Sequence, residues 1–366
     1  MGEIMHDCIG IINLDEKEDN LKELISKDSI SSMEFAGRYK VIDFALSNLT
    51  NSGVDRIGIF TKRKSNSILS YLNNNRSWNI SNKKNGINVF NYGEYDICKD
   101  DVHNFIENIE FIEYSNKEYV IIIPSYMICN IDYKMILDFH KKSKRDITVI
   151  YKQERDGGDR FLECEEISIG FNNKVIDINK VDKNEEYINI NMEMYIMKTS
   201  LFIDIVRKSV TTGLYKKVKE YIKYNLETIN VGAYEFSGYL SCINSIKSFF
   251  ESNKEILNID ISNELFYKNK SIYTDSREDV PVYYSKTSKV INSIVANGSY
   301  IEGKIENSII GKNVKISEGA IIKNSIIMNG AYIDKGSIIN NTIVKEKSII
   351  QKYQIFNGNE NYPEIV

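Results

Sequence analysis

The sequence predicts an α/β domain with a mostly parallel sheet, followed by a solenoid of short parallel strands. From residue 8 to about 200, apolar runs rich in Ile and Val alternate with amphipathic stretches of helix length. That alternation is typical of β-α-β units. Towards the C-terminus the pattern changes to a short repeat with Asn and Ile at fixed positions. A fixed short period is typical of stacked coils that bury their apolar rows against one another.

Four apolar runs predict the buried strands of the parallel sheet, at residues 8–13, 56–61, 119–124 and 146–151. They are nearly continuous in Ile and Val, as expected for strands that helices cover on both faces.

Three amphipathic segments predict helices. Residues 41–53 place their apolar side chains on one face and end at Gly53, a typical stop signal. A second helix follows the acidic pair at 100–101, which can cap its N-terminus, and runs through Ile112. The third begins at Asp132, and its apolar face comprises Met135, Ile136 and Phe139.

The solenoid prediction depends on four copies of one tetrapeptide, which begin at Asn292, Asn307, Asn324 and Asn341 with spacings of 15, 17 and 17 residues. Apolar anchors recur within each period, so three short strands per coil are expected. These anchors are Ile310, Ile316, Ile322, Ile327, Ile333, Ile339, Val344 and Ile350. We expect the Asn residues to form a ladder at one corner. An antiparallel β domain is the alternative, but the fixed period and the lack of polar alternation argue against it.

The predicted domains are residues 1–256, a connector at 257–281, and residues 282–366. The connector is expected to be ordered, because several apolar side chains in it require burial. These are Ile259, Ile261, Leu265, Phe266 and Tyr267.

Composition excludes several classes of protein. A net charge of −4 in 366 residues is no signature of nucleic-acid binding. The five Cys are scattered without a C-x-x-C pair, and three His leave few metal ligands. No apolar run reaches the roughly 20 residues of a membrane span. We therefore expect a cytoplasmic protein with no nucleic-acid or membrane partner.

The segment Phe35–Gly53 resembles the block "GGKFRIIDFALSNCINSG" of the glucose-1-phosphate adenylyltransferase (ADP-glucose pyrophosphorylase) family. Further similarity is present at 130–133, 263–266, 272–274 and 292–303, so the resemblance covers nearly the whole chain. It implies a Rossmann-like nucleotidyltransferase domain followed by a left-handed parallel β-helix of hexapeptide repeats. The family joins ATP and glucose 1-phosphate to give ADP-glucose and pyrophosphate, in glycogen synthesis.

The chain departs from this family at the positions that the chemistry needs. A Gly-rich loop that cradles the triphosphate should follow the first strand, but acids including Asp15 and Glu16 occur here. Ile30 occupies the position of a family Lys. The two metal-binding Asp positions correspond to Tyr126 and Cys242, neither of which suits a hard cation. We therefore predict no catalytic residues, no metal and no cofactor.

Other positions predict anion binding. Lys180 corresponds to the family's sugar-phosphate Lys, although a solvated strand-edge lysine is the simpler interpretation. The effector region of the family corresponds to a basic group that could converge on an anion. Its members are Arg38, Lys40, Lys62, Arg63 and Lys64. A solvated basic face is again the simpler alternative.

The resemblance is greatest to the non-catalytic GlgD-type subunit of the family. It implies a regulatory or structural pseudoenzyme that joins a catalytic ADP-glucose pyrophosphorylase subunit in a hetero-oligomer, expected to be a tetramer, and responds to a sugar-phosphate effector. The alternatives are a weakly active adenylyltransferase and a free-standing sugar-phosphate sensor. A hexapeptide-repeat acyltransferase is disfavoured, since its usual general base is a His on the solenoid and no His follows residue 140.

Overall fold

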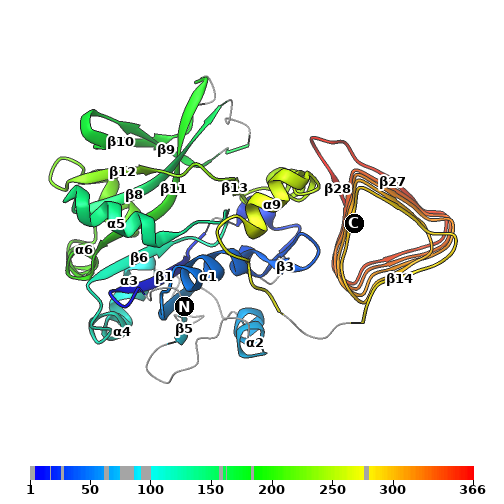
Figure 1. Ribbon diagram of the computed structural model, residues 1–366, viewed down its shortest axis with the longest axis horizontal. Helices are drawn as coiled ribbons and strands as arrows, with labels where there is room; N and C mark the ends of the chain where they lie inside the picture. Colours follow the sequence, from blue (N-terminus) through cyan, green and yellow to red (C-terminus); the bar gives the residue numbers. More distant parts are fainter. Residues whose placement is uncertain are drawn as a thin grey trace.

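The computed structural model shows an α/β part beside a three-sided coil (Figure 1). It describes residues 5–16, 18–25, 29–61, 66–74, 86–91, 100–155, 160–161, 163–182, 185–275 and 280–366. The predicted order of a sheet-and-helix part followed by a parallel β-helix is confirmed.

The sheet of the α/β part has parallel strands at its centre. β1 lies between β4 and β6, and β5 extends the parallel order beyond β4. These strands are β1 (Cys8–Leu14), β4 (Arg56–Thr61), β5 (Gly86–Asn91) and β6 (Tyr119–Ile123). Three of the four predicted strands are therefore present here, with ends that differ by a residue or less. The fourth, expected at residues 146–151 in the parallel sheet, is Ile147–Arg155, which ends four residues later and pairs antiparallel with Tyr187–Lys198.

The other side of the sheet is antiparallel and centres on the long strand β11, which pairs with β6, β8 and β9. β10 continues beyond β9, while β12 runs parallel to β8. These strands are β8 (Ile147–Arg155), β9 (Glu165–Ile169), β10 (Val175–Lys180), β11 (Tyr187–Lys198) and β12 (Val231–Glu235).

Alternation along β1 separates two cores on the two faces of the sheet. Cys8 and Ile12 face the core that α1 and α5 cover, whereas Ile9 and Ile11 face the core that α3, α6 and α7 cover. The helices are α1 (Val41–Asn51), α2 (Asn66–Asn74), α3 (Asp101–Glu107), α4 (Ile109–Glu113), α5 (Tyr133–Ser143), α6 (Thr199–Thr212), α7 (Val218–Tyr224), α8 (Ile246–Glu255) and α9 (Ile259–Tyr267).

Short elements complete this part. They are η1 (Asp19–Leu21), η2 (Ile30–Ser32), η3 (Phe171–Asn173), β2 (Glu34–Phe35), β3 (Tyr39–Lys40), β7 (Met127–Ile128) and β13 (Ser241–Cys242). β2 and β3 form a hairpin, and β7 pairs with β13.

Three local predictions were wrong in detail. The helix expected from residue 100 to 112 is two helices, because Asn108 leaves helical geometry (φ −113°, ψ 22°) between α3 and α4. Met135 lies on the solvent side of α5 and is 64% exposed. In α9, Leu265 and Phe266 are buried as expected, but Ile259 and Tyr267 are exposed because the helix packs through one face.

The β-helix has three faces, each a parallel sheet of five strands. The first is β14 (Tyr283–Tyr284), β17 (Tyr300–Ile301), β20 (Lys315–Ile316), β23 (Tyr332–Ile333) and β26 (Ile349–Ile350). The second is β15 (Lys289–Ile291), β18 (Lys304–Glu306), β21 (Ile321–Lys323), β24 (Ile338–Asn340) and β27 (Ile355–Asn357). The third is β16 (Ile294–Val295), β19 (Ile309–Ile310), β22 (Ile326–Ile327), β25 (Thr342–Val344) and β28 (Glu364–Ile365).

The repeat residues lie at the interior and corner positions that the repeat predicts. All eight predicted anchors lie in the interior of the β-helix. The four repeat Asn residues occupy one corner in the left-handed region, with φ between 41° and 48°, which Asn tolerates better than most residues. The side chains of Asn292 and Asn307 are hydrogen-bonded at 2.8 Å, which is one step of the expected ladder.

The third face of the β-helix docks onto the α/β part. Its outward side chains Ile309, Ile326 and Ile343 share a buried cluster with Phe35 and Phe44. This contact fixes the hairpin β2–β3 between the two parts. Among the helices that the structure describes, none combines the length and hydropathy of a membrane span.

Candidate functional site

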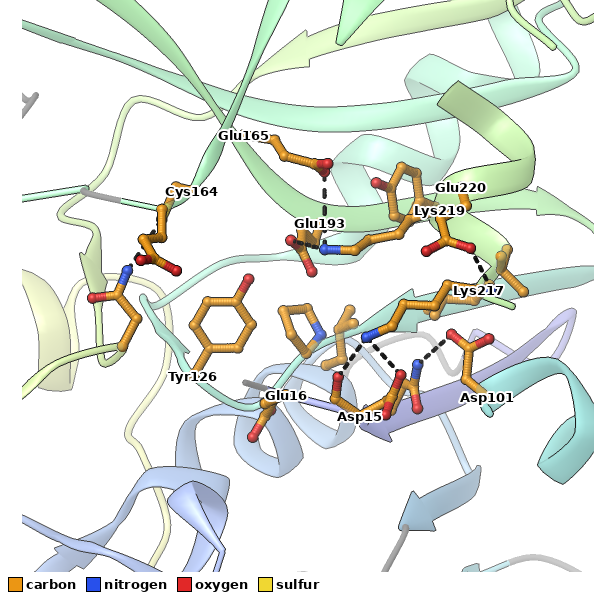
Figure 2. Close-up of a pocket in the computed structure, with 18 of the residues that line it drawn as sticks. Asp15, Glu16, Asp101, Tyr126, Cys164, Glu165, Glu193, Lys217, Lys219 and Glu220 are labelled. Carbon is orange, nitrogen blue, oxygen red and sulfur yellow. Dashed lines mark hydrogen bonds and ion pairs between the residues drawn. The ribbon is translucent and has the colours of Figure 1, made fainter. Parts of the chain in front are cut away.

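A cavity of about 280 Å³ opens at the carboxyl ends of β1 and β6. The ends of these strands form one wall, while β11 and the start of α7 form the opposite wall (Figure 2). The carboxyl edge of a parallel sheet is the usual ligand-binding position in α/β proteins. The charged lining comprises Asp15, Glu16, Asp101, Glu163, Glu165, Glu193, Glu220, Lys180, Lys217, Lys219 and Lys223.

The acids that follow β1 are engaged within the chain. Asp15 is buried, and its Oδ2 lies 2.6 Å from Nζ of Lys217. The same Nζ also donates to the Asp15 carbonyl oxygen at 3.1 Å. Glu16 Oε1 accepts from the backbone N and the Oγ of Ser125, both at 2.7 Å. Burial raises the pKa of Glu16 to about 7, although the hydrogen bonds from Ser125 oppose that rise.

The two acids at 100–101 have different roles, since one caps a helix and the other lines the cavity. Asp100 caps α3, since its side chain accepts from the backbone N of His103 at 3.2 Å. Asp101 lines the cavity and accepts from Nδ2 of Asn13 at 3.0 Å. The carboxylate of Asp101 therefore adds to the acids that line the cavity.

The opposite wall contains a second lysine–carboxylate pair. Nζ of Lys219 lies 2.5 Å from Oε1 of Glu193 and 3.9 Å from Oε2 of Glu165. Burial alone would lower the pKa of Lys219, but the carboxylates of Glu193 and Glu165 outweigh it and raise the pKa. Lys219 is therefore a charged ammonium bound to its own chain (Figure 2).

Tyr126 and Cys242 lie on neighbouring segments of the chain. The backbone N of Ile243 donates to the Tyr126 carbonyl at 2.9 Å, and Cys242 pairs with Met127 across β7 and β13. Burial raises the pKa of the Tyr126 hydroxyl well above its ordinary value, and the negative charge of Glu193 adds to the rise.

The thiol of Cys242 is fully buried, with its Sγ 3.3 Å from Sγ of Cys164. Burial raises the pKa of Cys242 well above its ordinary value, so this thiol is neutral. A neutral phenol and a neutral thiol do not fit Mg²⁺, which prefers oxygen anions. Nowhere in the described ranges are three or more His, Cys, Asp or Glu side chains arranged to hold a metal ion.

The remaining predicted positions are divided between this cavity and other places. Ile30 is buried in η2 and contributes an apolar contact to the cavity. Lys180 is the last residue of β10 and lies exposed at the cavity rim. Three predicted cations, Lys62, Arg63 and Lys64, lie outside the described residues.

Arg38 and Lys40 meet different neighbours, since Arg38 lies in the turn of the hairpin and Lys40 ends β3. Lys40 Nζ donates to the Ser32 carbonyl at 3.0 Å. Arg38 instead lines a second cavity of about 260 Å³, together with Lys312 of the β-helix.

Sequence reasoning did not identify Glu193, Lys217 or Lys219 as site residues. The run Lys216–Lys219 was visible in the sequence, but such a run at the start of a helix is ordinarily a solvated surface. Nothing local marks Glu193, whose position depends on the irregular pairing of β11.

Comparisons with known proteins agree with this architecture. Residues 21–258 match the family model "Nucleotidyl transferase", and residues 280–360 match "GlmU-like, C-terminal hexapeptide". The chain is 27% identical over 319 residues to "Glycogen biosynthesis protein GlgD" of Bacillus subtilis, which covers 86% of this chain and 82% of that protein. It is 29% identical over 320 residues to the protein of the same name from Geobacillus stearothermophilus, again with 86% and 82% covered.

The similarity extends to proteins named as enzymes. The chain is 29% identical over 313 residues to "Glucose-1-phosphate adenylyltransferase" of Mycoplasma mobile, which covers 83% of this chain and 81% of that protein. Because the first family model spans well over half of the sequence and coincides with the sheet that builds the cavity, the chain belongs to the nucleotidyl transferase family.

Proposed function

We propose that this chain is a catalytically deficient, regulatory subunit of an ADP-glucose pyrophosphorylase and acts in glycogen biosynthesis. The observation that carries the proposal is the pair Tyr126 and Cys242, neutral side chains where the resemblance implies two metal-binding carboxylates. Nucleotidyl transfer at phosphorus depends on a metal ion and on cations that stabilise the developing charge. The similarity to proteins named GlgD and glucose-1-phosphate adenylyltransferase supports the pathway.

The lysines of the cavity support the same conclusion. Lys217 and Lys219 could neutralise phosphate oxygens, but each is bound to a carboxylate of the chain. A triphosphate that entered would have to displace those carboxylates and approach further acids. The cavity therefore disfavours ATP and Mg²⁺ as ligands in the wild-type chain.

A catalytic partner follows from this proposal. On the second face of the β-helix, Ile338 and Ile355 are paired on adjacent strands and are 39% and 67% exposed. They point outward, as do the isoleucines through which the third face docks onto the α/β part. We assign this face to a second, catalytically active chain of the same family, in a hetero-tetramer. Contiguous exposed apolar surface is typical of protein–protein contacts.

The direct test compares the chain alone, a catalytic relative alone, and both co-expressed. Each sample is incubated with ATP, glucose 1-phosphate and Mg²⁺, and pyrophosphate release is measured beside the mass of the complex. The proposal expects no release from this chain, a mixed complex, and altered kinetics of the catalytic chain. Robust release by this chain alone would instead indicate an adenylyltransferase, and failure to co-purify would leave a free-standing sensor.

The effector proposal concerns the cavity between the hairpin and the β-helix. Arg38 and Lys312 bring two cations to it from the two parts, and Tyr39 and Phe266 form an aromatic floor. A guanidinium can bind a phosphate through two parallel hydrogen bonds. Arg38→Ala should therefore reduce the response of the mixed complex to sugar phosphates, whereas Lys304→Ala, an exposed cation on the second face, should not. Identical activation curves for the wild-type and Arg38→Ala complexes would contradict the proposal.

A further inference from the structure

Glu193 has an unusual backbone conformation in the middle of a long strand. Its φ is 53°, in the left-handed region that L-residues other than Asn and Asp seldom adopt. The pairing of β11 with β8 shifts register between Asn191 and Met194, so Glu193 lies in a bulge. Asn191 Oδ1 accepts from the backbone N of Glu193 at 2.9 Å and fixes this bulge. Strained residues of this kind concentrate at functional positions.

The bulge directs the carboxylate of Glu193 into the cavity. Its Oε1 meets Nζ of Lys219 at 2.5 Å, at the centre of Figure 2. In the same view, Lys217 at the start of α7 reaches across the cavity, and its Nζ lies 2.6 Å from Oδ2 of Asp15. Two ammonium groups from one short segment are thus held by two carboxylates, one in β11 and one directly after β1.

In these two ion pairs, the ammonium groups that an anion would need are already bound to carboxylates of the chain. A phosphate monoester binds best where ammonium or guanidinium donors face an open space, since each charge-assisted hydrogen bond is short and strong. With Glu193 in place, Lys219 gives such a bond to the chain itself. The remaining carboxylates of the lining repel an incoming anion as well.

We propose that Glu193 is the specificity-determining residue of this cavity and closes it to phosphate-bearing ligands. It acts as an internal counter-anion that a strained bulge holds against Lys219. Its removal converts the cavity into a site for a sugar phosphate, with Lys219 as the principal donor. The inference rests on the proposed lack of catalysis and names the side chain that excludes the ligand.

The test measures binding of glucose 1-phosphate and of inorganic phosphate to the full chain by titration calorimetry. Glu193→Gly removes the carboxylate and supplies the residue that favours positive φ. Glu193→Gln removes the charge but keeps the side chain and its strain. Both variants should bind glucose 1-phosphate at least about tenfold more tightly than the wild type, as expected for one recovered charge-assisted contact.

Two matched controls distinguish the release of Lys219 from a general loss of negative charge in the cavity and from the relief of backbone strain. Glu163→Gln removes the same charge from the same cavity without releasing Lys219, and Asn116→Gly relaxes an exposed residue with the same φ of 53° far from the site. Neither should gain binding. Circular dichroism and thermal unfolding establish that each variant is folded.

Two results for the variants would overturn the proposal. One is that Glu193→Gly and Glu193→Gln are folded but bind glucose 1-phosphate no more tightly than the wild type. The other is that Glu163→Gln gains as much affinity as they do. Tight binding by the wild type that persists in Arg38→Ala, and so does not come from the cavity beside the β-helix, would overturn it too, while leaving the proposed lack of catalysis intact. Pyrophosphate release by the wild type in the separate assay would instead refute the proposed function.

Discussion

Glu34 on the β2–β3 hairpin binds Asn329 of the β-helix through both carboxylate oxygens. Oε2 accepts from the backbone N of Asn329 at 3.0 Å, and Oε1 accepts from its Nδ2. Burial raises the pKa of Glu34 to about 7, and the hydrogen bond from Asn329 opposes that rise. A polar contact thus lies beside the apolar contact that joins the two parts of the chain.

Asn329→Ala should lower the free energy of unfolding, because the Oε1 atom of Glu34 loses its donor while it remains buried. At pH 8, where Glu34 is charged, a loss of about 1–3 kcal/mol is expected for a hydrogen bond to a charged acceptor. Urea denaturation measures it. Asn340→Ala, which removes an exposed Asn–Asn hydrogen bond on the second face, should change stability by no more than about 0.5 kcal/mol. Equal losses in the two variants would contradict the assignment.

Asp43 should make stability depend on pH. It is fully buried and accepts from the backbone N of Lys40 at 2.9 Å and from the Tyr71 hydroxyl at 2.7 Å. Burial raises its pKa from 3.8 to about 7 despite these hydrogen bonds. Between pH 4 and 7 the native state then holds a proton that the unfolded state releases, so stability falls as pH rises.

The slope from one such group is about 1.4 kcal/mol per pH unit. Asp43→Asn should remove it, so its free energy of unfolding varies less over this range than that of the wild type. Asp138→Asn, which changes an exposed carboxylate on α5, should leave the wild-type slope in place. An unchanged slope in Asp43→Asn would show that Asp43 does not hold the proton.

The corner residue Asn324 tests the conformation on which the coils depend. Its φ is 46°, and its backbone N donates to the Glu306 carbonyl at 3.0 Å. Asn324→Ala should cost about 1 kcal/mol, because Ala tolerates the left-handed region less well than Asn. Asn324→Gly should be nearly neutral, since Gly adopts positive φ without a steric penalty. Thermal unfolding of the two variants gives the comparison, and a greater loss in the Gly variant would refute it.

Ile326 and Ile338 test which face of the β-helix is docked. Both point outward, but Ile326 is 4% exposed in the contact with the α/β part and Ile338 is 39% exposed. Ile326→Ala should cost about 2–4 kcal/mol through lost burial and the cavity left behind. Ile338→Ala should stay within about 0.5 kcal/mol in the isolated chain. Similar costs, measured in urea, would mean that the third face is not the docked one.

The fold could be predicted wherever its signals are local or periodic. The segment at 41–53 carries both its apolar face and its terminal Gly53, and α1 follows it closely. The β-helix follows from the 17-residue repeat. The break at Asn108 could not be predicted, because apolar periodicity continues across it; its Nδ2 donates to the Asn104 carbonyl and the chain turns there.

Only some residues of the candidate site could be predicted from the sequence, because the others reach the cavity only in the folded chain. The acids after β1 form a run in the sequence, so Asp15 and Glu16 could be recognised as unsuited to a triphosphate. Their partners could not, since Lys217 is 202 residues from Asp15 and meets it only through the folded sheet. Glu193 is more hidden still, because its role depends on a bulge that no residue type signals.

The corner geometry of the β-helix has a consequence for how its length can change over evolution. The chain returns to the same corner after each coil, so duplication or deletion of one whole coil leaves every later side chain on its original face. A change of two residues confined to a corner turn is tolerated as well, because the coil from Asn292 to Asn307 has 15 residues and the next two have 17, yet their Asn residues occupy the same corner. Loss of one residue inside a strand would instead turn outward-facing isoleucines such as Ile326 or Ile343 inward and break the contact with the hairpin. Relatives should therefore differ here by whole coils or in the corner turns.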